Sequence, residues 1–378
     1  MRGLTYAILS ISLLTVMAGA AMAPALGAIK EHFSDSSPLL VQFIVSLPAL
    51  LIIITTFFFR PLCRLMRSRT LALVGLTLYV AAGAGAFFVD GIGVLLVLRA
   101  LLGVSVGMIM PLSTGLLSFY FPPRMQSRLM GLSAAMNQMG GVVATMLAGV
   151  LATVEWRYAF LVYLAGLLAI VLVAALLPNE QLASRGSRLE IKTLVRFHPS
   201  VTAMFLIMLL FFVYPTNFAL TAREQGVSTI ATTFIMVGLD LVAFIVGLLF
   251  GWLMHCFRRQ MKYAAPLFFF VGYSALAFIP GLPGMIVGSV LIGLANGAGV
   301  PYVNTIASIK GGRDAAVTVM PLISAALYLG QFLSPLIVSP LAAAIGTPEA
   351  PYFVALCIAV LFIVQVILTR RHHALPPA

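Results

Sequence analysis

Residues Leu98–Ser118 read LRALLGVSVGMIMPLSTGLLS, and this stretch decides how the rest of the sequence is interpreted. It is apolar apart from Arg99 and is long enough to cross a bilayer, which takes about 20 residues. Gly103 and Gly107 follow Arg99 in steps of four, so one helical face carries the charge and then two positions without a side chain. Glycines at this spacing let helices approach closely in lipid, and Pro111 is expected to bend or end the helix. The stretch therefore predicts a membrane-spanning helix that packs tightly against a neighbour.

A second stretch, Ile292–Ser308, reads IGLANGAGVPYVNTIAS and repeats the first one 190 residues later. The same offset, without a gap, pairs Gly103 with Gly293, Gly107 with Gly297, Pro111 with Pro301, Ser118 with Ser308, Met130 with Met320 and Gly140 with Gly330. A single offset that matches glycines and a proline indicates a duplicated chain. Two halves of similar topology are a feature of secondary transporters.

The composition excludes a water-soluble globule. Charged residues make up 8% of the chain, hydrophobic residues 62%, and the mean hydropathy is +1.11, whereas about a quarter of a soluble domain is charged. The net charge of +12 does not indicate nucleic-acid binding, because the basic residues lie in short loops between apolar runs. Cys63, Cys256 and Cys357 are widely spaced and match no metal or disulfide pattern. We expect a polytopic all-α membrane protein without a cofactor.

The hydropathy pattern predicts twelve membrane-spanning helices in two six-helix halves related by pseudo-two-fold symmetry. The expected spans are 4–28, 38–59, 70–89, 92–118, 128–153, 157–177, 200–222, 228–254, 262–280, 284–308, 316–344 and 351–369. A cleavable signal peptide is the alternative for the first span, but the repeat needs this helix as the partner of the seventh. The predicted domains are therefore 1–178 and 200–378, joined by a polar connection at 179–199.

The basic residues predict the orientation. Of the 22 Lys and Arg residues, Arg99 lies within a span, and Lys30, Arg157 and Arg223 lie on one side of the predicted bundle. All the others lie on the opposite side, which the positive-inside rule assigns to the cytoplasm. We expect a multi-pass protein of the inner (cytoplasmic) membrane, with both termini and the central connection in the cytoplasm.

Two loops at equivalent positions carry a motif. Residues 60–69 read RPLCRLMRSR and residues 251–260 read GWLMHCFRRQ. Both resemble the cytoplasmic signature of the major facilitator superfamily, Gly-x-Leu-Ala-Asp-Arg-x-Gly-Arg-Arg. Gly251 fits its first glycine, but the acidic position holds Arg64 or His255 and the second glycine is Arg67 or Arg258. The resemblance implies a gating role for these loops, and the alternative is basic residues that only fix the topology.

Helices four to six extend the resemblance. Arg99–Pro111 is similar to the family's fourth-helix pattern, and residues 155–160, EWRYAF, are similar to a Gly-Trp-Arg-x-x-Phe turn that opens helix six, with Glu155 in place of the glycine. Asn137–Gly141 supplies the glycines, but not the proline, that are typical of drug:proton antiporters. The resemblance implies the twelve-helix fold of the superfamily and favours its antiporter group.

Two ionisable residues remain well inside the predicted spans, Arg99 and Asp240. Such residues are candidates for function because a bare charge is costly in a bilayer. Asp240 is expected to exchange a proton, with a buried hydrogen-bonding role as the alternative. Arg99 is a candidate for proton coupling or for contact with an anionic substrate, with a contact to backbone carbonyls as the alternative.

Neutral polar residues also lie within predicted spans. In the superfamily, helices one, two, four, five, seven, eight, ten and eleven line the central cavity. The polar residues on these helices that we expect to contact substrate are Gln42, Asn137, Gln138, Tyr214, Asn217, Asn296, Tyr328 and Gln331. Each could instead join two helices by a hydrogen bond.

These features predict a transporter rather than an enzyme. The favoured function is proton-coupled export of a small organic compound by alternating access, carried out by a monomer in the lipid bilayer. The alternative is uptake or exchange of a small organic anion with Arg99 as the anion contact. A membrane enzyme or receptor is disfavoured, because no catalytic constellation is found in the sequence.

Overall fold

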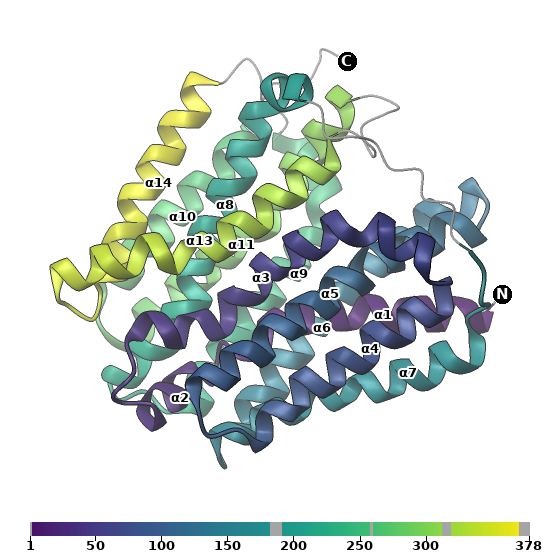
Figure 1. Cartoon of the computed structure of the whole chain (residues 1–378). Coiled ribbons are helices and arrows are strands. Elements are labelled where there is room, and N and C mark those ends of the chain that lie inside the picture. Colours follow the sequence, from purple (N-terminus) through teal and green to yellow (C-terminus); the bar gives the residue numbers. More distant parts are fainter. Residues whose placement is uncertain (1, 182–190, 258–259, 312–318, 370–378) are drawn as a thin grey trace. The chain divides into compact units, whose positions relative to one another are not determined.

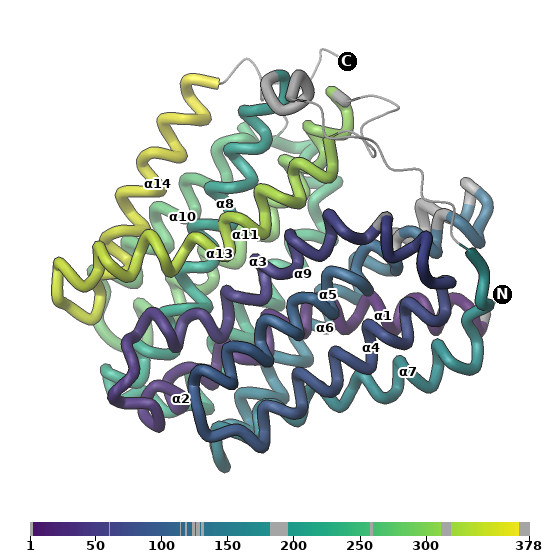
Figure 2. Tube along the Cα trace, viewed as in Figure 1, coloured from purple at the N-terminus to yellow at the C-terminus, as the bar shows by residue number. Residues whose placement is uncertain are grey.

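The computed structural model describes residues 2–181, 191–257, 260–311 and 319–369, and within these ranges every regular element is a helix. Figure 1 shows the helices, and Figure 2 traces the chain with the remaining residues in grey. The elements up to residue 181 are α1 Arg2–Ala20, α2 Leu26–His32, α3 Pro38–Leu65, α4 Ser68–Gly85, η1 Ala86–Phe88, α5 Ile92–Tyr120, α6 Pro123–Leu151, η2 Trp156–Leu164 and α7 Ala165–Leu176. Those after it are α8 Ile191–Glu224, α9 Thr229–Phe257, α10 Met261–Phe278, α11 Gly281–Gly311, α13 Met320–Ile345 and α14 Ala350–Leu368.

The described residues contain twelve segments that are long and apolar enough to cross a membrane, which confirms the predicted number of spans. Most of them match the predicted ranges closely, as the second span does at Pro38–Phe59. The sixth span begins as the 3-10 helix η2 and continues as α7. Pro111 and Pro301 lie inside α5 and α11 and do not end these helices.

The first span departs from the prediction, because α1 ends at Ala20 rather than near residue 28. Pro24 explains the break, since it has no N–H to donate to the Ala20 carbonyl four residues earlier. Residues 21–25 form a turn, and the short helix α2 follows. The turn is buried, and Ala21 and Met22 are fully covered. The break leaves carbonyl groups at the end of α1 without their helical partners.

The chain divides into two compact units. The first is Met1–Arg185 with Ser228–Thr233, and the second is Gly186–Val227 with Phe234–Ala378. In the first unit α3 packs along α5, α1 along α6, and α4 against α5 and α7. In the second unit α10 packs against α11 and α14, and α8 packs along α13.

Glycines set the closest helix contacts of the first unit. A Cβ atom on Gly103 would lie 2.5 Å from the Pro48 carbonyl oxygen, and one on Gly107 would lie 2.6 Å from Thr55 Cβ. On α6, a Cβ on Gly140 would overlap the Leu13 carbonyl group of α1. The absence of side chains therefore lets α5 lie against α3 and α6 against α1.

The second unit repeats these contacts at the matching glycines. A Cβ on Gly293 would lie 2.7 Å from the Leu239 carbonyl oxygen of α9, and one on Gly297 would lie 2.6 Å from that of Ala243. A Cβ on Gly330 of α13 would lie 2.6 Å from the Phe205 carbonyl oxygen of α8. Glycines paired by the 190-residue offset therefore occupy equivalent contacts in the two units.

Candidate functional site

Arg99 is buried among helices of the first unit, with 1% of its surface exposed. Its Nε donates a hydrogen bond to the Ile44 carbonyl of α3 at 3.0 Å, and its Nη2 donates to the Ala18 carbonyl of α1 at 3.3 Å. Both terminal nitrogens also donate to the Tyr163 hydroxyl, at 3.0 and 2.6 Å. The guanidinium thus ties three membrane-spanning segments to α5.

The backbone geometry explains why these two carbonyls are available. Ile44 lies four residues before Pro48, which has no N–H to complete the helical hydrogen bond. Ala18 is among the last residues of α1, whose carbonyls have no helical partners and form the negative end of the helix dipole. Arg99 therefore provides donors where a proline and a helix end have removed them.

Aromatic rings complete the surroundings of Arg99. The guanidinium carbon lies 5.1 Å from the centre of the Tyr163 ring and 5.8 Å from that of Phe160, within the range of a cation–π contact. The Tyr163 hydroxyl in turn donates to the Ala18 carbonyl at 3.0 Å. This is the backbone-carbonyl contact that the sequence left open as an alternative, and the part of Arg99 in proton coupling stays a prediction.

The residue 190 positions after Arg99 is Ser289, on α11 of the second unit. Its hydroxyl donates to the Met285 carbonyl at 2.6 Å and lies 2.6 Å from the Tyr214 hydroxyl of α8. Ser289 and Tyr214 are both 1% exposed. Where the first unit buries a guanidinium, the second unit therefore buries a pair of hydroxyl groups. Sequence analysis missed Ser289, although the repeat offset could have identified it.

Tyrosines make further equivalent contacts in the two units. The Tyr79 hydroxyl of α4 donates to the Leu14 carbonyl at 3.2 Å, and the Tyr273 hydroxyl of α10 donates to the Leu210 carbonyl at 2.5 Å. Each hydroxyl thereby joins its helix to the first helix of its own unit. No sequence pattern indicated these bonds, because tyrosines are common in spans and the partners are backbone atoms.

Asp240 lies on α9 of the second unit and is partly buried. It follows Leu239, whose carbonyl oxygen packs against Gly293, and it interacts electrostatically with Tyr214. Tyr214 in turn pairs with Ser289. Asp240 is a carboxylate within a span, as the sequence predicted.

The predicted polar residues of the first unit lie in different surroundings. Asn137 accepts a hydrogen bond from Thr15 Oγ1 at 2.8 Å, and this bond joins α6 to α1. Gln138 is exposed, and Gln42 on α3 is buried with 3% of its surface exposed. Asn137 thus contributes to helix packing in the first unit.

In the second unit, Asn217 donates to the Val213 carbonyl of its own helix at 2.9 Å. Gln331 on α13 directs its amide nitrogen at the sulfur of Met208, 3.8 Å away. Tyr328 is partly buried. Asn296 differs from the others, because its buried Oδ1 accepts no hydrogen bond from the described residues.

The loop between α3 and α4 is held by the start of the predicted connection. Gln181 Nε2 donates to the carbonyls of Cys63 and Arg64 at 2.6 and 3.1 Å, and the Ser68 N–H donates to the Glu180 carbonyl at 2.8 Å. The side chains of Arg64 and Arg67 are exposed. In the equivalent loop of the second half Gly251 and His255 are exposed, and Arg258 lies outside the described residues.

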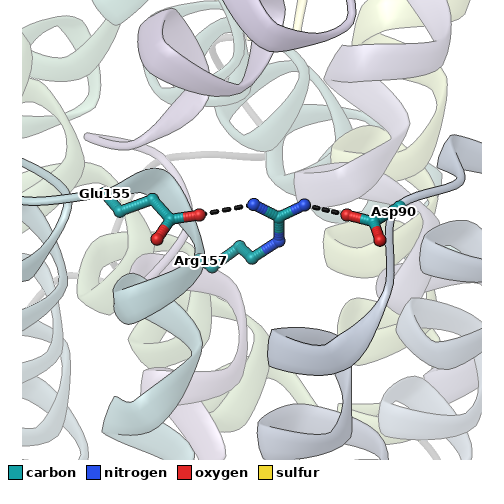
Figure 3. A network of polar contacts seen from close by, with 3 residues as sticks. All are labelled: Asp90, Glu155 and Arg157. Atoms are coloured by element: carbon teal, nitrogen blue, oxygen red, sulfur yellow. Dashed lines mark hydrogen bonds and ion pairs between the residues drawn. The ribbon is translucent and has the colours of Figure 1, made fainter.

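A polar network lies at the opposite end of the first unit, where η2 begins (Figure 3). Arg157 forms ion pairs with Asp90, which precedes α5, and with Glu155. Its guanidinium also stacks 4.8 Å from the centre of the Trp156 ring. Glu155, which replaces the glycine of the family turn, therefore serves as a partner of the arginine in that turn.

Comparisons with known proteins agree with this architecture. Residues 8–335 match the family model of the Major Facilitator Superfamily. A bacterial homolog of the human lysosomal transporter Spinster, solved in an inward-facing and unoccupied conformation, has a TM-score of 0.78 at 15% identity, over 99% of this chain and 98% of that one. The nucleoside transporter NupG has a TM-score of 0.74 at 12% identity, over 99% of this chain and 100% of that one. A comparison with curated protein sequences finds no match.

The twelve apolar helices and these matches define a multi-pass membrane protein of the transporter class rather than an enzyme. The chain belongs to the Major Facilitator Superfamily. The likeness to the two solved transporters, at identities below 25%, concerns the fold alone.

Proposed function

We propose that this protein is a proton-coupled secondary transporter that exports a small organic compound. In this proposal the halves 1–178 and 200–378 move as two bodies in alternating access, and the protein acts as a monomer. Membership of the superfamily supports transport, and the choice of proton as the coupling ion rests on Asp240. Of the two solved neighbours, NupG is named a nucleoside transporter and the other is named only as the homolog of a lysosomal transporter, so neither fixes the substrate here.

Asp240 is the single observation that carries the proposal. It is a partly buried carboxylate inside a span, and it interacts electrostatically with the buried Tyr214 of α8. Ionisation in such surroundings costs free energy, so the group favours proton uptake on one side of the membrane and release on the other as its exposure changes.

The geometry of Arg99 gives little support to the alternative of anion uptake. Four hydrogen bonds from its guanidinium go to Ile44, Ala18 and Tyr163. An anionic substrate would have to displace these bonds. We therefore assign Arg99 to the integrity of the first unit, through which it affects transport.

Asp240→Asn tests the coupling. The variant keeps the size and hydrogen bonding of the side chain but cannot titrate. In proteoliposomes with an imposed pH gradient, we expect it to lose gradient-driven transport while still binding substrate and exchanging it at equal concentrations. The matched control is Asp90→Asn, which removes an exposed carboxylate. Full gradient-driven transport by Asp240→Asn would contradict proton coupling through this residue.

The proposed location is the inner (cytoplasmic) membrane with both termini in the cytoplasm. A variant without the exposed Cys256 and Cys357 provides the background for labelling. In this background, Ser228→Cys at the α8–α9 turn should react with an impermeant maleimide on intact cells, and Arg67→Cys should not. The reverse pattern would overturn the orientation.

A further inference from the structure

The side-chain oxygen of Asn296 is buried and accepts no hydrogen bond from any residue that the structure describes. An unsatisfied buried acceptor costs about 1–3 kcal/mol, and the core of a bilayer offers no water to relieve it. The amide of Asn137 in the first unit avoids this cost by accepting a bond from Thr15. The asparagine at this position therefore needs an explanation other than helix packing.

The internal repeat shows that the scaffold does not require a polar residue here. The position equivalent to Asn296 is Val106, which is fully buried in the first unit. The glycines beside both residues make matching contacts, Gly107 with α3 and Gly297 with α9. A valine thus satisfies the same backbone arrangement without leaving an unpaired atom.

The neighbours of Asn296 show which side of α11 it occupies. It lies three residues after Gly293, which faces α9, and three before Gly299, which faces Ile207 of α8 and Ala265 of α10. Ser289 lies seven residues earlier, about two helical turns along the same face, and its hydroxyl contacts Tyr214 of α8. Asn296 is therefore on the α8-facing side of α11, the side that carries the contact of Ser289 with Tyr214.

We propose that Asn296 recognises the transported compound by accepting a hydrogen bond from one of its N–H or O–H groups. The inference rests on the proposed transport function and names the substrate class, an organic compound that presents a hydrogen-bond donor. The oxygen is closed off in this conformation, so the donor reaches it in another state of the transport cycle. A ligand that pairs with the atom in only one state shifts the equilibrium toward that state.

The experiment compares two asparagines that differ in their partners. Asn296→Val copies the residue of the other half and removes an unpaired acceptor. Asn137→Val removes an acceptor that is paired with Thr15. We expect the melting temperature of the purified full-length protein to stay unchanged or to rise by about 1–3 °C in the first variant, and to fall by a similar amount in the second.

Transport is measured in proteoliposomes with two probes, uridine, which carries several donors, and tetraphenylphosphonium, which carries none. We expect Asn296→Val to lower kcat/KM for uridine about tenfold or more, mainly through a higher KM, because the lost bond discriminates between substrates. Any transport of tetraphenylphosphonium should be unaffected by the substitution.

Two results would overturn the role of Asn296 in substrate recognition but leave the proposed transport function standing. One is wild-type uptake of uridine that Asn296→Val leaves unchanged. The other is a melting temperature for Asn296→Val that falls as far as that of Asn137→Val, which would mark a packing role. A wild-type protein that moves neither probe would instead count against the proposed transport of such compounds, and with it against both proposals.

Discussion

The buried centres of the two units differ in chemistry although the same glycine contacts surround them. In the first unit Arg99 donates to two backbone carbonyls and to Tyr163. In the second unit the equivalent position is Ser289, which is paired with Tyr214. One scaffold therefore accommodates either a cation or a neutral pair of hydroxyls at the same place.

The difference shows what a buried cation needs in a helical membrane protein. Carbonyls inside a helix already accept one backbone hydrogen bond each, so carbonyls with no other partner are scarce. The first unit provides acceptors by two interruptions, Pro48 in α3 and the end of α1 at Ala20. The second unit places hydroxyls there, which bring their own acceptors, and its charge is the carboxylate of Asp240.

The largest expected effect comes from removing the cation. Arg99→Ala leaves the Ile44 carbonyl without its side-chain donor at about 1–3 kcal/mol, whereas Tyr163 still donates to the Ala18 carbonyl. The substitution also opens a cavity that costs about 2–5 kcal/mol more. Arg99→Lys should destabilise nearly as much, because a single ammonium cannot replace the planar fork that reaches α1, α3 and Tyr163. The melting temperature of each purified variant in detergent measures its loss of stability. Ser289→Ala is the matched control, and its cost should be about 1 kcal/mol. A stable Arg99→Lys would show that charge alone suffices.

The next largest loss of stability is expected at the glycine contacts, which both units share. Gly103→Leu and Gly293→Leu should each destabilise by about 1–3 kcal/mol or more, because the new side chain would overlap the backbone of the facing helix. Folded yield and transport report the loss. Gly115→Leu and Gly247→Leu, on the same helix pairs but facing open space, should be tolerated. Tolerance of Gly103→Leu or Gly293→Leu would contradict the tight contact, and unlike effects would break the equivalence of the units.

Tyrosine hydroxyls should give a smaller and unequal effect. Tyr163→Phe removes a group bonded to the buried guanidinium, which should cost about 1.5–3 kcal/mol, whereas Tyr273→Phe removes one neutral bond to the Leu210 carbonyl, which should cost about 1 kcal/mol. Thermal unfolding of the two variants measures the difference. Equal losses would mean that the charge of Arg99 adds nothing to the bond.

The smallest loss of stability is expected from removing exposed polar contacts at the ends of the helices. Asp90→Asn breaks one ion pair of Arg157, and Gln225→Ala breaks the 3.0 Å hydrogen bond to Glu349 in the second unit. The Asp90 side chain is 78% exposed, and exposed pairs are worth about 0–1 kcal/mol. Unfolding measured at low and high salt should show a small loss for Asp90→Asn that salt reduces further. A loss as large as that of Tyr163→Phe would show that the network is structural.

The sequence predicted the fold in considerable detail. Long apolar runs have few alternatives to membrane-spanning helices, because a lipid environment requires every backbone group to be paired. The 190-residue offset predicted that Gly103 and Gly293 make equivalent close contacts. It did not predict the end of α1 at Ala20, since a proline in a span can either bend or break a helix, and the surrounding contacts decide between them.

The site was predicted less completely. Arg99 and Asp240 were evident from the sequence, because a charge inside an apolar run is conspicuous whatever the neighbours are. Their partners were not evident, since the acceptors of Arg99 are backbone carbonyls, which every residue has. Asn137 and Asn296 look alike in sequence. Only the packing of α6 against α1 gives the first a partner in Thr15, whereas the Oδ1 of the second accepts no hydrogen bond from the described part of the chain. The sequence by itself determined the spans, the repeat and the buried charges through hydropathy, whereas the tertiary structure decided which polar atoms are satisfied, because a hydrogen bond depends on distances between helices that no local pattern records.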